Sequence, residues 1–230
     1  MAAEAVAISF GFGAGLIAVA TLAMVLPTVQ DVVVLLTLGC MLPELVVVLK
    51  TLKFVRWREV IVVLLFTAMG VPLGTAALEW INPPLALTLL GVFLLTVGVV
   101  FLFLPARSEG IAWPRWAGPL AGLMGGILGG MFGTGGPPII IYFHLSKLHK
   151  STFRGQLMVV LGAITLVRLP SYAMAGLFTM TRIWSGLAII PFVAAGALAG
   201  YHLHLEIKEE TFRKVVSLLL AGMGLLLLLR

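Results

Sequence analysis

The chain has 230 residues, of which 61% are hydrophobic and 10% are charged, and its mean hydropathy is +1.16. Soluble domains carry about 25% charged residues, so this composition excludes an ordinary soluble protein and indicates a lipid bilayer as the surrounding solvent. The formal net charge of +6 comes from basic residues that gather in short loops. Membrane topology requires basic residues there, and we therefore expect no nucleic-acid partner.

Eight apolar runs cover most of the chain. They lie at residues 5–27, 32–50, 59–78, 85–104, 117–143, 155–177, 184–203 and 213–229. Each run is close to the ~20 residues that a helix needs to cross a hydrocarbon layer of ~30 Å. The start of the chain lacks the positive region of a cleavable signal peptide, so we expect it to belong to the mature protein. The predicted fold is an all-α polytopic membrane protein.

The charges of the loops predict which side of the membrane each loop faces. Residues 50–58 hold four basic residues and are expected in the cytoplasm, whereas residues 79–84 hold none and are expected outside. Residues 105–116 carry two arginines and return to the cytoplasm. If residues 117–143 then crossed the membrane as one helix, the basic loop at residues 146–154 would lie outside, against the positive-inside rule.

The stretch GTGGPP at residues 133–138 offers a solution to this conflict. Glycine and proline are poor residues for a helix interior, and a chain that turns back here keeps residues 146–154 in the cytoplasm. Residues 176–182 then lie outside and residues 204–214 inside. The alternative of one kinked helix over residues 117–143 stays open, because the positive-inside rule has exceptions.

An internal repeat relates the two halves of the chain. The glycines of GFGAG at residues 11–15 align with GTGGP at 133–137, the Leu-Pro pair at 42–43 aligns with that at 169–170, and Gly98 aligns with Gly224. The offset between matching residues stays between 122 and 127. Single matches of small residues are weak, but their common order and near-constant offset favour a duplication.

The duplication and the turn at residues 133–138 together predict two inverted repeats, as in many secondary transporters. The first repeat covers residues 1–104 and the second covers residues 117–230, with a cytoplasmic linker at 105–116. Each repeat is expected to contain a broken or re-entrant glycine-rich segment, at 11–15 or at 133–138, followed by three transmembrane helices.

The break at residues 133–138 is the first candidate binding site. Interrupted backbone at membrane depth leaves N–H and C=O groups unpaired and survives only where protein, water or a substrate pairs them. Glycine allows a ligand to approach closely, and proline suits the first turn of a helix that starts near Pro137 or Pro138. The positive end of that helix favours an anion. The expected substrate-binding residues are Gly133, Thr134, Gly135, Gly136, Pro137 and Pro138. The glycines at residues 121–130, in contrast, need only close helix packing.

Arg168 is the second candidate, because it lies in the middle of an apolar run. An arginine at that depth costs at least about 2.5 kcal/mol, so we expect it to face protein or a water-filled cavity. Its planar fork can hold an oxyanion through paired hydrogen bonds. The alternative is a salt bridge that only braces the bundle. Pro170, two residues later, is expected to loosen the helix.

Glu44 is the third candidate and follows Pro43, the proline that matches Pro170 in the other half. Three roles stay open for its carboxylate: an ion-pair partner of Arg168, a carrier of the coupling proton, or a residue near water without a role. The single cysteine, Cys40, cannot form an internal disulfide, and no metal site is expected around it.

At these residues the sequence resembles the sulfite exporter TauE/SafE family of membrane permeases. The glycine-rich break, the Phe153–Arg154 pair and the run Arg-Leu-Pro-x-Tyr-x-x-x-Gly at 168–176 occur together, and RWREV at 56–60 and GVPLG at 70–74 also fit. The resemblance implies that residues 133–138 line the permeation site, with Arg168 and Tyr172 beside it. Gly11 and Gly13 are the matching first-half residues. Substrate contact there stays open, since the family has three consecutive glycines where this chain reads GFGAG.

The resemblance implies export of small sulfur oxyanions and organosulfonates across the bacterial inner membrane. We expect a secondary transporter that works by alternating access, with no cofactor, because the chain has neither a phosphate-binding loop nor an HExxH motif. An anion channel or a non-catalytic subunit of a membrane complex stays open as an alternative, and an intramembrane enzyme is less favoured. The expected partners are a small anionic substrate and the lipid bilayer, and a homodimer stays open.

Overall fold

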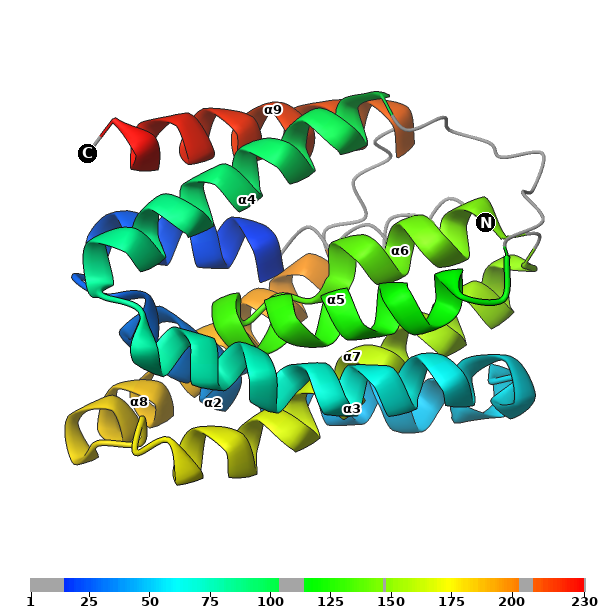
Figure 1. Ribbon diagram of the computed structural model, residues 1–230, viewed down its shortest axis with the longest axis horizontal. Helices are drawn as coiled ribbons and strands as arrows, with labels where there is room; N and C mark the ends of the chain where they lie inside the picture. The colour runs from blue at the N-terminus through cyan, green and yellow to red at the C-terminus, as the bar shows by residue number, and fades with distance from the viewer. Residues whose placement is uncertain (1–14, 104–113, 147, 203–208, 230) are drawn as a thin grey trace. The chain divides into compact units, whose positions relative to one another are not determined.

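The computed structural model describes residues 15–103, 114–146, 148–202 and 209–229. All regular elements in these ranges are helices (Figure 1), which confirms the all-helical prediction. They are a helix over Gly15–Val25, α2 (Val29–Thr51), the 3-10 turn η1 (Leu52–Phe54), α3 (Trp57–Trp80), α4 (Pro83–Phe103), α5 (Ala117–Phe132), α6 (Gly136–Leu145), α7 (Lys150–Met174), α8 (Met180–His202) and α9 (Glu209–Leu228).

Three of the described helices are long and apolar enough to cross a membrane. They are α3, α4 and the part of α7 over Ser151–Met174. The segment over Val29–Phe54 is bent by 48° between Val29–Leu42 and Glu44–Phe54, and it forms a fourth span if the two parts are counted together. The bend falls at Pro43, a residue with no N–H to complete the helix. The chain is therefore a multi-pass membrane protein.

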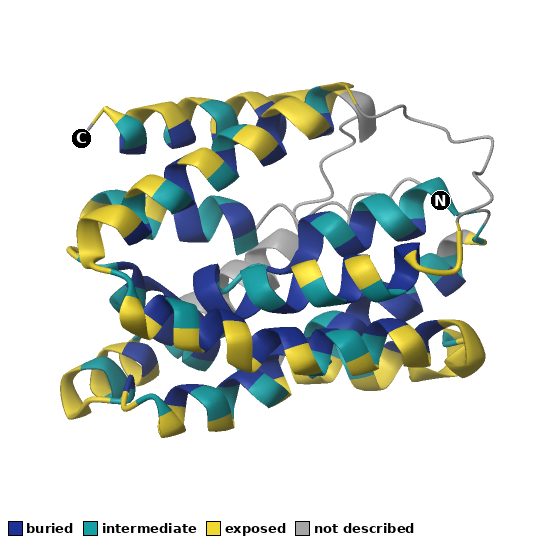
Figure 2. Cartoon of the chain, in the orientation of Figure 1, coloured by how far each residue is buried: buried dark blue, intermediate teal, exposed yellow. Residues whose placement is uncertain are grey.

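The exposed side of α3 has the composition expected next to lipid (Figure 2). Ile61, Leu65, Met69 and Leu73 follow one another at a spacing of one helical turn, and between 47% and 61% of each side chain is exposed. The opposite side, including Val63, is buried. Hydrocarbon is the one solvent in which such a stripe carries no penalty, which agrees with a membrane-spanning α3.

The contacts between Cα atoms divide the chain into two compact units. One unit contains residues 1–32, 81–106 and 191–230, and the other contains residues 33–80 and 107–190. Each unit therefore combines segments from both halves of the sequence.

In the first unit, α4 and α9 pack against each other in antiparallel directions. A Cβ on Gly91 would lie 3.1 Å from the carbonyl oxygen of Gly224, and a Cβ on Gly98 would lie 2.7 Å from that of Ser217. The partner numbers on α9 fall as those on α4 rise, which defines the antiparallel direction. Glycine at these crossings lets the backbones approach within van der Waals contact, the main source of helix association in a bilayer.

In the second unit, α5 packs along α3 in a parallel direction through glycines. A Cβ on Gly122 would lie 2.5 Å from the carbonyl oxygen of Val63, and the hydroxyl of Thr67 donates a 3.1 Å hydrogen bond to the carbonyl of Gly122. One and two turns further, Gly126 lies against the carbonyl of Thr67 and Gly130 against that of Val71. The prediction that the glycines of residues 121–130 serve close helix packing is confirmed.

Candidate functional site

The predicted break lies between α5 and α6. Gly133 ends α5 in the left-handed conformation, with φ 75° and ψ 0°, and its N–H donates a 3.1 Å hydrogen bond to the carbonyl of Gly129. A residue with a Cβ is strained at this φ, so glycine is the residue that suits the turn. Gly135 is the N-cap of α6, and Pro137 lies in its first turn. The new helix begins at Gly136, one residue before the predicted start.

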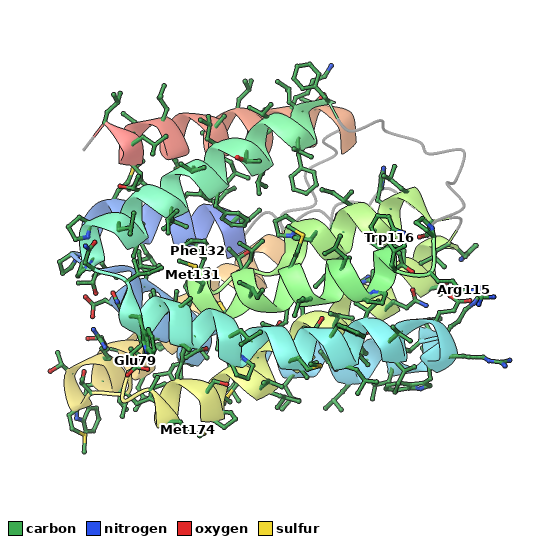
Figure 3. All side chains as sticks on the ribbon, in the orientation of Figure 1. Glu79, Arg115, Trp116, Met131, Phe132 and Met174 are labelled. Atoms are coloured by element: carbon green, nitrogen blue, oxygen red, sulfur yellow. The ribbon has the colours of Figure 1, made fainter. Side chains whose placement is uncertain are left out.

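The chain turns back at this break, and α6 returns along α5. A Cβ on Gly125 would lie 2.5 Å from Cδ1 of Ile139, and a Cβ on Gly118 would lie 3.1 Å from the hydroxyl of Tyr142. The partners on α6 advance as the positions on α5 recede, so the two helices form an antiparallel hairpin (Figure 1). In Figure 3, Met131 and Phe132 mark the end of α5 at the turn, and Arg115 and Trp116 mark its other end.

The turn of the hairpin offers a small number of backbone donors. A helix that begins at Gly136 leaves its first amides without an intrahelical acceptor, but Pro137 and Pro138 carry no N–H. None of the backbone hydrogen bonds found outside the helices, among the described residues, has the amide of Thr134, Gly135 or Gly136 as donor. Gly133 and Thr134 are partly exposed, whereas Gly135 and Gly136 are buried.

Arg168 lies against this turn although it is 35 residues away in sequence. Its side chain is 4% exposed, and its Nη1 lies 3.4 Å from the carbonyl oxygen of Gly129. A Cβ on Gly133 would lie 3.4 Å from the same nitrogen. The Nε of Arg168 is buried and has no hydrogen-bond partner among the described residues. The fold therefore brings the break and the buried guanidinium together. Pro170 lies inside α7, and the helix continues to Met174.

Tyr172 lies one helical turn after Arg168 and is fully buried. Its hydroxyl donates a 2.8 Å hydrogen bond to the carbonyl of Gly130. The Cζ atom of Arg168 lies 5.8 Å from the centroid of the Tyr172 ring, a distance at which a guanidinium and an aromatic ring attract each other. The ring of Phe178 meets the Tyr172 ring edge-on at a centroid distance of 6.3 Å.

Arg168 and Tyr172 both donate hydrogen bonds to the C-terminal end of α5. The last carbonyls of a helix have no intrahelical donor and carry the negative end of its dipole. The guanidinium lies at the Gly129 carbonyl and the hydroxyl at the Gly130 carbonyl. Arg168 thus contacts the end of α5 through a hydrogen bond and, among the described residues, makes no salt bridge; its unpartnered Nε leaves capacity for a ligand.

Glu44 contacts Thr165 and not Arg168. The hydroxyl of Thr165 donates a 2.6 Å hydrogen bond to Oε2 of Glu44, and this bond joins α7 to α2. No carboxylate of a described residue lies within 4.0 Å of the Arg168 guanidinium. The predicted first-half residues Gly11 and Gly13 lie outside the described residues.

Two further polar residues, Thr165 and Gln156, were not predicted from the sequence. Thr165 precedes Arg168 by three residues, so the two lie on one face of a helix. This spacing could have identified Thr165 as a residue near the site. Gln156 is fully buried, its Nε2 donates a 3.1 Å hydrogen bond to Glu59 of α3, and its Oε1 has no partner among the described residues. Nothing in the sequence marked it. Within the described ranges, no group of three or more His, Cys, Asp and Glu side chains is arranged to hold a metal ion.

The chain is similar to known membrane exporters. The model of the family described as sulfite exporter TauE/SafE matches residues 1–227. A relative from Cupriavidus necator, described as a probable sulfite/organosulfonate exporter TauE, is 28% identical over 223 residues, which cover 94% of this chain and 82% of the relative. No solved structure matches the chain.

Proposed function

We propose, since the chain belongs to the sulfite exporter TauE/SafE family, that it is a secondary transporter for a small sulfur oxyanion such as sulfite or an organosulfonate. It exports this anion across the bacterial inner membrane by alternating access. The family and the apolar helices support a membrane transporter and not an enzyme. The observation that carries the proposal is the position of the buried Arg168 guanidinium at the turn of the α5–α6 hairpin.

The chemistry of this turn suits an oxyanion. Arg168 supplies a permanent positive charge and an Nε–H that has no acceptor among the described residues. The turn adds the amides of Gly135 and Gly136 at the positive end of the α6 dipole. Thr134, between Gly133 and Gly135 in sequence, carries a hydroxyl that can donate as well. In the part of the chain that the structure describes, no carboxylate lies within 4.0 Å of the guanidinium to compete for it. An anion at this position would receive charge-assisted hydrogen bonds, which are the strong ones in a site of low dielectric constant.

The arrangement of α4 and α9 supports the two inverted repeats, residues 1–104 and 117–230. Gly98 and Gly224 are 126 residues apart, as are Gly91 and Ser217. A Cβ on Gly98 would lie 2.7 Å from the carbonyl oxygen of Ser217, and a Cβ on Gly224 would lie 2.7 Å from that of Gly91. If each residue is replaced by the residue that matches it in the other repeat, the contact of Gly98 with Ser217 becomes the contact of Gly224 with Gly91. Such a self-complementary contact between antiparallel helices is typical of a two-fold axis between inverted halves.

The hairpin supports the proposed orientation in the membrane. Because α6 returns along α5, the start of α5 at Ala117 and the end of α6 at Leu145 lie at one end of this hairpin, where the loops before α5 and after α6 join it. Both loops carry basic residues, and the positive-inside rule places both in the cytoplasm. The break is then a re-entrant segment whose turn points into the membrane, and the same arrangement is proposed for the first repeat at residues 11–15.

Glu44 is the proposed carrier of the coupling proton. It lies on α2 in the unit that contains Arg168, and its carboxylate accepts the Thr165 hydroxyl, three residues before Arg168 on α7. Among the described residues this carboxylate has one hydrogen-bond donor and no ion-pair partner, and carboxylates inside a membrane bundle are typical of proton relays. A proton there would be linked to the anion through α7.

Flux of radiolabelled sulfite into proteoliposomes tests the function. Wild-type protein is expected to give saturable flux and counterflow against trapped sulfite, which a channel would not give. Arg168→Ala is expected to lower this flux by at least about 100-fold, because a buried charge-assisted contact is lost. Arg182→Ala is the matched control, since Arg182 also donates to a backbone carbonyl, that of Leu177, at 3.1 Å. Unchanged flux in folded Arg168→Ala protein would contradict the role of Arg168.

A further inference from the structure

The C-terminal turn of α5 presents carbonyl oxygens that must find donors outside the helix. The carbonyl of Gly129 has two donors, the Gly133 amide at 3.1 Å and Arg168 Nη1 at 3.4 Å. The carbonyl of Gly130 has the Tyr172 hydroxyl at 2.8 Å. Arg168 and Tyr172 are four residues apart on α7, so they face the same end of α5. Each of the two side chains therefore donates to one of two neighbouring carbonyls, Arg168 to Gly129 and Tyr172 to Gly130.

This division determines how many donors Arg168 keeps for a ligand. A guanidinium has five N–H donors, and a buried carbonyl without a partner attracts the nearest of them. While the Tyr172 hydroxyl donates to the Gly130 carbonyl, the guanidinium donates, within the described ranges, only to the Gly129 carbonyl. Its Nε then has no hydrogen-bond partner among the described residues. If the hydroxyl is removed, the Gly130 carbonyl becomes a buried acceptor next to the guanidinium.

The aromatic ring of Tyr172 also restricts the positions that the guanidinium can adopt, independently of the hydroxyl. It lies 5.8 Å from the Arg168 Cζ atom, and the ring of Phe178 meets it edge-on at a centroid distance of 6.3 Å. A phenylalanine at position 172 keeps these two ring contacts and deletes the hydrogen bond alone. The hydroxyl can therefore be tested by itself.

We propose that Tyr172 is a positioning residue for Arg168 and not a ligand of the anion. Its hydroxyl occupies the Gly130 carbonyl and so leaves Nε of the guanidinium without a partner among the described residues, while Nη1 lies at the turn near Gly133. This inference rests on the proposed function, because it assigns to Arg168 the contact with the transported anion. It goes beyond that function by giving Tyr172 an indirect part in the affinity of the same site.

The test compares saturation of sulfite flux in proteoliposomes. Tyr172→Phe is expected to raise KM by about tenfold and to leave the maximal rate within about twofold, because the guanidinium turns to the Gly130 carbonyl and binds the anion more weakly. Tyr172→4-aminophenylalanine restores a donor on the same ring and is expected to restore KM. Tyr142→Phe, which removes a hydroxyl elsewhere on the hairpin beside Gly118, is the control and is expected to leave KM unchanged. If Tyr172→Phe does not fold, 4-fluorophenylalanine, which fills the volume without a proton to donate, takes its place.

A second comparison separates an indirect role from direct contact. In an Arg168→Lys background, which has no Nε–H, Tyr172→Phe is expected to change the affinity no further, measured as KM or, in variants without flux, as Kd for radiolabelled sulfite. An equal further loss in that background would assign the hydroxyl to the anion itself and overturn the proposal, as would an unchanged KM in Tyr172→Phe alone. Absence of saturable sulfite flux in the wild-type protein would instead overturn the proposed function.

Discussion

The hydroxyl of Thr165 donates a 2.6 Å hydrogen bond to the carboxylate of Glu44, and this bond links α7, which carries Arg168, to α2. Glu44→Gln keeps an oxygen that can accept this bond but removes the site for a proton. We expect sulfite flux driven by a pH gradient to fall by at least about tenfold and sulfite counterflow to persist, because only the coupling step requires the carboxylate. Glu79→Gln, which removes a carboxylate at the end of α3, is the control and is expected to keep gradient-driven flux. Full gradient-driven flux in Glu44→Gln would exclude Glu44 as the proton carrier.

Gly133 and Gly176 provide a matched pair for the turn of the hairpin, since both have positive φ, 75° and 66°. Alanine at either position is expected to lower the free energy of unfolding by about 1–2 kcal/mol through backbone strain. A Cβ on Gly133 would also lie 3.4 Å from Arg168 Nη1, whereas a Cβ on Gly176 would have nothing within 4 Å. Gly133→Ala is therefore expected to lose sulfite flux beyond its loss of stability, and Gly176→Ala is not. Equal flux in the two variants would argue against a role of Gly133 at the site.

The contact of α5 with α3 predicts which glycines of the chain tolerate a methyl group. Gly122→Ala places a Cβ 2.5 Å from the Val63 carbonyl oxygen, which must move the two backbones apart. The expected loss in the free energy of unfolding is about 1–3 kcal/mol, the usual effect of overpacking. Gly222→Ala, on an exposed part of α9 with nothing within 4 Å, is expected to be neutral or to stabilise by up to about 1 kcal/mol. Thermal unfolding in detergent measures both, and a Gly122→Ala protein as stable as wild type would show that the helices can separate freely.

The mirrored environments of Gly98 and Gly224 predict equal effects of equal substitutions. Alanine at either position meets a carbonyl oxygen at 2.7 Å and a backbone nitrogen at 2.6–2.7 Å. We expect the two single variants to lose similar stability, within about 0.5 kcal/mol of each other, and the double variant to lose less than the sum, because the first methyl group already separates the helices. A large difference between the single variants would weaken the two-fold relation between the repeats.

The membrane orientation can be measured by cysteine labelling in a Cys40→Ala background. Glu79→Cys, at the end of α3, is expected to react with a membrane-impermeant maleimide in intact cells. His149→Cys, between α6 and α7, is expected to react only after the membrane is permeabilised, because the proposed orientation of the hairpin places this loop in the cytoplasm. Strong labelling of His149→Cys in intact cells would remove the re-entrant hairpin and the inverted repeats together.

Much of the fold could be predicted because its causes are local in sequence. The apolar runs at residues 59–78 and 85–104 differ from α3 and α4 by two residues or fewer at each end. The break was expected at residues 133–138 because glycine and proline act on their own backbone, and the observed turn lies at Gly133–Gly135. The burial of Arg168 was expected for a similar reason, since its charge cannot face lipid.

The partners of these residues could not be predicted, because they depend on how helices far apart in sequence are aligned. Thr165 and Glu44 are 121 residues apart, and Tyr172 and Gly130 are 42 apart. The period of a helix gives the face of a residue but not the height at which another helix passes it. The acceptors for Tyr172 and Arg168 are also backbone carbonyls, which every residue has, so no residue type marks them in the sequence.

The lengths of the two hairpin helices determine how deep the turn at Gly133 can reach. The 10 residues of α6 extend over roughly 15 Å at about 1.5 Å per residue, which is about half of a hydrocarbon layer of ~30 Å. In the proposed orientation, an anion held there from the cytoplasmic side would have crossed part of the electric field of the cell membrane, with the remainder still to cross. Because one full charge gains about 2.3 kcal/mol per 100 mV, occupancy of the turn by an anion would then depend on voltage as well as on concentration.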